Sequence, residues 1–203
     1  MAIEYGASAL GLVSAMPSGP GVIPEETIAE IARLVPPGVA SFLLTSKQDA
    51  DSIIEQQRRC RTNTLQLVDS VSLETYARLR EALPGIAIVQ VIHVRGEESI
   101  DEAVNVSRHV DTLLLDSGNP TRAVKELGGT GRTHDWTISR KIREIVDIPI
   151  YLAGGLHAGN VVQAIREVGP FGIDLCSGVR TNGSLDRRKL ASFFESVRSA
   201  HNP

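Results

Sequence analysis

The sequence predicts an α/β protein in which parallel strands alternate with helices. Three apolar segments support this fold, because each ends in a polar or glycine-rich turn and precedes a helix-like segment: 113–118, 151–155 and 174–179. The strands are mostly unbroken apolar runs, such as 87–92, as expected when helices cover both faces of a parallel sheet. In such a fold the chemistry is expected at the carboxyl ends of the strands.

Seven strands are expected, each followed by a helix. Apolar residues at helical spacing indicate the helices, and proline or glycine pairs such as Pro84-Gly85 and Gly169-Pro170 end them. Asp49, Ser72 and Asp186 are predicted to cap helix N-termini. The expected strands are 9–14, 39–45, 64–68, 86–94, 112–116, 150–153 and 172–176, and the expected helices are 24–34, 49–60, 72–83, 98–110, 137–146, 160–168 and 186–200.

Seven strand–helix units are one short of the eight that close a barrel. Residues 1–5 resemble the last turn of a helix that stops at Gly6, so we expect a (β/α)8 TIM barrel without its first strand, built as one domain over residues 1–203. The exposed edges of strands 9–14 and 172–176 either close on each other in a strained seven-stranded barrel or are covered by a second copy in a homodimer. The dimer is the preferred alternative.

Composition excludes several classes of protein. The formal net charge is -3, which offers no basic patch for nucleic acid. No apolar run approaches the roughly 18 residues that span a membrane, and no signal peptide is recognisable, so a cytoplasmic protein without a membrane partner is expected. Cys60 and Cys176 lie far apart without C-x-x-C spacing, which predicts reduced thiols and no metal site.

The strand ends offer one carboxylate, Asp116, and two glycine turns at 154–155 and 177–178. Glycine lets backbone N–H groups approach a phosphate without a Cβ in the way, and a following helix N-terminus adds positive potential. These features predict that a phosphorylated small molecule binds here. In the alternative interpretation Asp116 only caps the turn with Ser117-Gly118, and the glycines form simple tight turns.

Four motifs in order carry a family resemblance: Asp116, the segment 128–136 (GGTGRTHDW), the segment 152–156 (LAGGL) with Asn160-Val161, and the segment 174–179 (DLCSGV). Together they resemble phosphoribosylanthranilate isomerases of tryptophan biosynthesis. The resemblance implies a (β/α)8 barrel and an Amadori rearrangement, in which an intramolecular oxidoreductase turns an aminoaldose phosphate into an aminoketose phosphate without a cofactor or metal.

The resemblance also implies residue roles. Asp116 would be the general acid that protonates the ribose ring oxygen. The substrate phosphate would be bound by Gly154, Gly155, Ser177 and Gly178. An active-site loop that arches over the site would contain Gly129, Thr130 and Gly131. Trp136, at the start of the next helix, is expected to be a packing anchor.

The chain also departs from the family pattern. The family's base, a cysteine on the first strand, has no counterpart here, and its arginine that faces the anthranilate carboxylate is absent from segment 18–21 (SGPG). A family histidine is replaced in the segment Val68-Asp69. Three residues remain candidates for the base: Asp69, His93 and Cys176.

Strand alternation predicts that Cys176 faces away from Ser177, with Asp174 on the same face as Cys176 and available to tie down the outer layer. A second function therefore stays open, that of a catalytically silent protein that binds a phosphorylated ligand.

Overall fold

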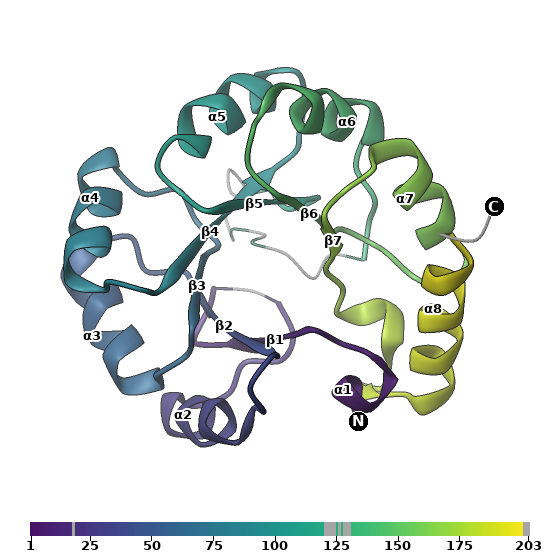
Figure 1. Ribbon diagram of the computed structural model, residues 1–203, viewed down its shortest axis with the longest axis horizontal. Coiled ribbons are helices and arrows are strands. Elements are labelled where there is room, and N and C mark those ends of the chain that lie inside the picture. Colours follow the sequence, from purple (N-terminus) through teal and green to yellow (C-terminus); the bar gives the residue numbers. More distant parts are fainter. Residues whose placement is uncertain (18, 120–124, 126, 128–130, 201–203) are drawn as a thin grey trace.

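The computed structural model describes residues 1–17, 19–119, 125, 127 and 131–200. Its main sheet is parallel throughout, and neighbouring strands follow the chain order. The strands curl around a centre, with helices on the outside (Figure 1). The strands of this sheet are β1 (Ala9–Val13), β2 (Ala40–Thr45), β3 (Thr64–Leu67), β4 (Ala87–His93), β5 (Thr112–Asp116), β6 (Ile150–Leu152) and β7 (Gly172–Ile173).

Two helices begin at predicted N-caps, whereas the expected helix 98–110 ends at Ser107. The Asp49 carboxylate accepts a hydrogen bond from the Ser52 N–H at 2.9 Å, and the Ser72 hydroxyl accepts one from the Thr75 N–H at 3.2 Å. These capping predictions are confirmed. The helices are α1 (Ala2–Tyr5), α2 (Glu25–Leu34), α3 (Ala50–Cys60), α4 (Leu73–Ala82), α5 (Glu98–Ser107), α6 (Trp136–Ile145), α7 (Val161–Val168) and α8 (Arg187–Ala200).

Apolar side chains pack on both faces of the sheet. One face of each strand packs against the surrounding helices, where Ile28, Leu43 and Leu65 are fully buried, and Trp136 packs against this layer as predicted. The other face fills the centre of the curled sheet with a second cluster: Phe42, Val68, Val89, Val91, Leu114, Leu127 and Ala153. This burial of both faces explains why the strands read as continuous apolar runs.

The sheet is open in the part of the chain that the structure describes. β1 pairs only with β2 along the sheet and β7 only with β6, so the predicted strained closure of seven strands is wrong. Closing seven strands would change the tilt and stagger that suit eight. Figure 1 shows α1 and α8 beside the gap between β1 and β7. Gly6 ends α1 with a φ of 112°, and a Cβ added there would lie 3.7 Å from the Phe194 ring of α8.

The chain after β7 differs most from expectation. The expected strand 172–176 ends at Ile173, because the chain turns into a 3-10 helix, η1 (Ser177–Val179). An unpredicted two-stranded hairpin follows, formed by β8 (Arg180–Thr181) and β9 (Ser184–Leu185). Among the described residues no helix is both long and apolar enough to cross a membrane.

Candidate active site

A cavity of about 100 Å³ lies inside the curled sheet and reaches the carboxyl ends of its strands. Almost every strand contributes to its wall, because interior-facing side chains of neighbouring parallel strands lie side by side. The wall includes Val13, Leu44, Gln66, Val91, Asp116, Ala153, Asp174, Cys176 and Ser177. This is the position where enzymes with parallel α/β barrels bind their ligands.

Asp116 is the last residue of β5, and its side chain is 7% exposed. One carboxylate oxygen, Oδ1, accepts the Ser117 backbone N–H at 2.8 Å. Burial raises the pKa of Asp116, against the lowering effects of Ser117 and of the neighbouring His93. A carboxyl whose pKa is raised by burial is suited to donate a proton near neutral pH.

Gly154 lies directly against Asp116. Its φ is 84°, and a Cβ built there would lie 3.2 Å from Asp116 Oδ1 and 3.0 Å from the Ser117 hydroxyl oxygen. Both the left-handed backbone and the close contact therefore require glycine at this position. The turn after β6 therefore lies directly beside the Asp116 carboxyl group.

Gly155 and Gly178 are held by backbone contacts. A Cβ on Gly155 would lie 2.6 Å from the Arg132 carbonyl carbon, and a Cβ on Gly178 would lie 2.0 Å from the Leu156 oxygen. Gly131 lines the cavity, and a Cβ built on it would lie 3.8 Å from the Ser177 hydroxyl. Segments 131–132, 154–156 and 177–178 therefore meet at one edge of the cavity. Gly129 and Thr130, which were predicted to lie in the active-site loop, fall outside the described residues.

The turn at Gly155 has free backbone donors. Asn160 braces it, because Nδ2 donates to the Gly155 carbonyl at 3.1 Å while Oδ1 accepts the His157 N–H at 2.8 Å. Within the described part of the chain, the N–H groups of Gly154, Gly155 and Ser177 donate no hydrogen bond. Adjacent unpaired N–H groups are a common arrangement for binding an anion.

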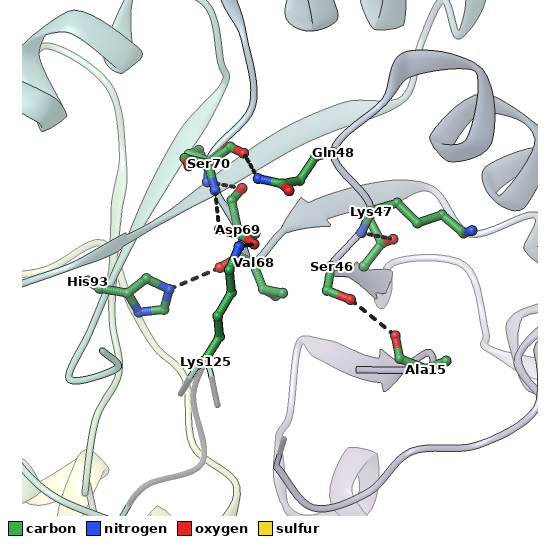
Figure 2. A network of polar contacts seen from close by, with 11 residues as sticks. Ala15, Ser46, Lys47, Gln48, Val68, Asp69, Ser70, His93 and Lys125 are labelled. Atoms are coloured by element: carbon green, nitrogen blue, oxygen red, sulfur yellow. Dashed lines mark hydrogen bonds and ion pairs between the residues drawn. The ribbon is translucent and has the colours of Figure 1, made fainter. Parts of the chain in front are cut away.

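Two candidates for the base, Asp69 and His93, are held by polar contacts to neighbouring residues (Figure 2). The Asp69 carboxylate accepts the Ser70 N–H at 2.9 Å and pairs with the Lys125 ammonium group. His93 is buried, and its Nε2 lies 3.0 Å from the Val68 carbonyl oxygen. Neither side chain is among the residues that line the cavity, although His93 lies opposite Asp116 in the β4–β5 register.

Asp174 and Cys176 both lie on the cavity wall. Both line the cavity together with Ser177, so the prediction that Cys176 and Ser177 face opposite ways is wrong, as is the outer-layer role for Asp174. Asp174 shares the interior face of the strand with Gly172, and the alternation is lost only beyond Asp174, where the chain turns toward η1. The short length of β7 carried no clear signal in the apolar pattern of the sequence.

Protein atoms crowd around Asp174, but its side chain remains open to water in the cavity. Burial and then the nearby Asp116 raise its pKa to about 6, while the Leu175 backbone N–H opposes the shift. Contact with solvent weakens the effect of burial on the pKa of Asp174. The pKa is still raised, because Asp116 lies in the same cavity and disfavours a second negative charge there. The two groups titrate as a pair.

The Asp174→Asn variant is expected to be more stable than the wild-type protein at about pH 7.5, and this gain should vanish below about pH 4. The pKa of Asp174 is raised in the folded protein from an ordinary value of 3.8 to about 6, so the folded state binds this proton more tightly. Wild-type stability therefore falls as pH rises through that interval, whereas asparagine does not ionise. Thermal unfolding of both proteins across this pH range checks the sign. A stability loss at every pH would contradict it.

An α/β barrel-type fold with its site at the carboxyl ends of the strands defines the class of protein. The family model described as N-(5'-phosphoribosyl)anthranilate (PRA) isomerase matches residues 2–196. The chain belongs to this family.

Similar proteins agree with the family model. An N-(5'-phosphoribosyl)anthranilate isomerase of Methanosarcina acetivorans is 32% identical over 97% of this chain and 87% of its own length. The corresponding isomerase 2 of Methanosarcina mazei is 34% identical over 98% of this chain and 88% of its length. The crystal structure of the phosphoribosyl anthranilate isomerase of Thermotoga maritima superposes with a TM-score of 0.81 at 27% identity, over 98% of this chain and 91% of that one.

A further solved structure contains a ligand. It is a phosphoribosyl anthranilate isomerase in complex with reduced 1-(o-carboxyphenylamino)-1-deoxyribulose 5-phosphate. It superposes with a TM-score of 0.79 at 25% identity and covers 98% of this chain and 91% of its own. The seven-stranded curled sheet described above matches the barrel of these structures over nearly its full length.

Proposed function

We propose that the chain catalyses the isomerisation of N-(5'-phosphoribosyl)anthranilate, an Amadori rearrangement from an aminoaldose phosphate to an aminoketose phosphate, in tryptophan biosynthesis. One observation carries the proposal: the Asp116 carboxyl group and the Ser177 turn line the same cavity, and the Gly154 turn lies against Asp116. A proton donor and an anion-binding edge therefore lie at the same small cavity. Membership of the isomerase family supports the same reaction.

Asp116 acts as the general acid in this proposal. Its carboxyl group protonates the ribose ring oxygen as the ring C–O bond breaks. The raised pKa of the buried group keeps a larger protonated fraction near neutral pH than an exposed aspartate has. A positioned proton donor typically contributes about 10² to 10⁴ in rate.

The substrate phosphate binds at the edge formed by Gly154, Gly155, Ser177 and Gly178. The unpaired N–H groups described above donate to its oxygens, and the Ser177 hydroxyl is available as a further donor. Gly178 has an additional structural role, since it has no side chain to collide with the Leu156 backbone. Gly131, on the described part of the loop, lies over Ser177.

The experiment is complementation of a tryptophan auxotroph that lacks this isomerase, together with a fluorescence assay of the purified protein. The wild-type chain should restore growth and turnover, and the matched Asp116→Asn variant should turn over about 10² to 10⁴ times more slowly. A folded wild-type protein that binds ribose 5-phosphate in calorimetry but shows no turnover would instead support the alternative, a catalytically silent phosphate-binding protein.

The oligomeric state and the compartment remain parts of this proposal. The unpaired edges of β1 and β7 favour association, because exposed strand edges offer free N–H and C=O groups. We therefore expect a homodimer in the cytoplasm. Light scattering at micromolar concentration checks the assembly, and a monomer with the same activity would contradict it.

A further inference from the structure

The proposed rearrangement needs a base as well as an acid, because a proton must leave C2 of the opened sugar. In the part of the chain that the structure describes, the ionisable side chains that line the cavity are Asp116, Asp174 and Cys176. No Lys, Arg or His is among these lining residues. A thiol is basic only as a thiolate, which usually requires a neighbouring cation or helix N-terminus. The carboxylate of Asp174 needs no such activation.

The backbone holds Asp174 on the interior face of the sheet. Its N–H donates to the Leu152 carbonyl at 2.9 Å, which extends the β6–β7 pairing by one residue beyond Ile173. Two residues earlier, Gly172 faces the same interior, where an added Cβ would lie 2.4 Å from the Tyr151 ring. The period of two along a strand then directs the Asp174 side chain inward.

Asp116 and Asp174 stand on either side of β6. Neighbouring strands lie about 4.8 Å apart, so the backbones of β5 and β7 are separated by roughly 10 Å. Ala153 and Gly154, the two residues that follow β6, line the cavity there, and neither has a side chain larger than a methyl group, which leaves room for the carbon atoms of a sugar. An acid and a base on opposite sides of the sugar carbons is the arrangement that the rearrangement requires.

We propose that Asp174 is the general base of the reaction and faces Asp116 across the bound sugar. The assignment rests on the proposed isomerase function. The different hydration of the two carboxyl groups supports the division of roles. Asp116 is 7% exposed, which favours its protonated form, whereas Asp174 is open to cavity water, which favours its ionised form. The raised pKa of Asp174, about 6, is close to the value that suits a base near neutral pH.

The proton and electron balance is complete without another reactant. After Asp116 has opened the ring, the nitrogen lone pair forms a C1=N iminium bond. The Asp174 carboxylate then removes the proton from C2. The electron pair of the C2–H bond forms the C1=C2 double bond, and the electron pair of the C=N π bond returns to nitrogen. The resulting enol loses its hydroxyl proton and gains one at C1, which gives the ketone. C1 is reduced and C2 is oxidised within one molecule.

The test compares the wild-type protein with Asp174→Asn, Asp174→Glu and the matched surface control Asp101→Asn, which removes an exposed carboxylate from the first turn of α5. We expect Asp174→Asn to lower kcat by about 10² to 10⁴. Asp174→Asn should bind reduced 1-(o-carboxyphenylamino)-1-deoxyribulose 5-phosphate, an analogue of the product, with the same affinity as the wild-type protein. Asp174→Glu should recover part of the activity, and Asp101→Asn should keep all of it.

A substrate deuterated at C2 provides a readout that a structural role would not change. If Asp174 removes this proton, Asp174→Glu should show a larger isotope effect on kcat than the wild-type protein, because proton abstraction becomes more rate-limiting. Wild-type turnover together with a fully active Asp174→Asn would overturn the assignment and leave the isomerase function intact. Retained activity in Asp174→Asn with loss in Cys176→Ala would transfer the role to the thiol. An inactive wild-type protein would overturn both proposals.

Discussion

The Asp116→Asn variant is expected to lose about 10² to 10⁴ in kcat while it keeps its fold and its affinity for ribose 5-phosphate. Asparagine has nearly the same shape, and its Oδ1 can still accept the Ser117 N–H that aspartate accepts at 2.8 Å. It cannot release a proton to the ring oxygen. Steady-state kinetics of the isomerisation, with circular dichroism on the same samples, measures the effect.

Asp101→Asn is the matched control, because it removes a carboxylate from an exposed position on α5. This variant should match the wild-type protein in both activity and stability. The turn-capping interpretation of Asp116 predicts the opposite pattern for Asp116→Asn, with a lower melting temperature and unchanged activity per folded molecule. That result would remove Asp116 from the reaction.

Gly178→Val is expected to lower the stability of the fold and not only the affinity for phosphate. A Cβ at this position would lie 2.0 Å from the Leu156 carbonyl oxygen and 3.2 Å from the His157 Cα, and both are backbone atoms. Added atoms in a packed site typically cost about 1 to 3 kcal/mol, and more when the backbone must move. Thermal unfolding should therefore show a melting temperature several degrees lower.

Gly159→Val serves as the control, since its added Cβ would meet only the exposed ring of His157, at 3.2 Å. It should leave the melting temperature close to that of the wild-type protein. Calorimetry with ribose 5-phosphate on the folded fraction of Gly178→Val then separates the two roles of the glycine. An unchanged melting temperature would contradict the structural role, and an unchanged affinity would contradict the phosphate-binding role.

Local signals in the sequence predicted most of the fold. Asp49 and Ser72 cap their helices as expected, and Gly169 ends α7 with a φ of 63°. Such signals act through short-range hydrogen bonds and backbone conformation, so they can be recognised without knowledge of the fold. The order of the parallel strands then follows from the regular alternation of strands and helices.

The region after β7 could not be predicted in the same way. The turn that brings Asp174, Cys176 and Ser177 to one cavity depends on packing between η1 and the turn at Leu156, which is a contact between distant segments. A pattern with a period of two carries no information about such a contact. The β8–β9 hairpin did have a signal, since Asn182-Gly183 is a typical two-residue hairpin turn, and both residues have positive φ.

The shortness of β7 has a consequence for dynamics. β7 pairs with β6 through two residue pairs, whereas β1 pairs with β2 through five. Regions with few backbone hydrogen bonds open at a lower free energy than the rest of a protein, so amide hydrogens in the last strand–helix unit should exchange with solvent first. Asp174 and Ser177 belong to this unit. A phosphorylated ligand that contacts both this unit and the turn at Gly155 should therefore slow amide exchange in this unit more than anywhere else. Ligand binding would then be coupled to local folding of the C-terminal part of the barrel.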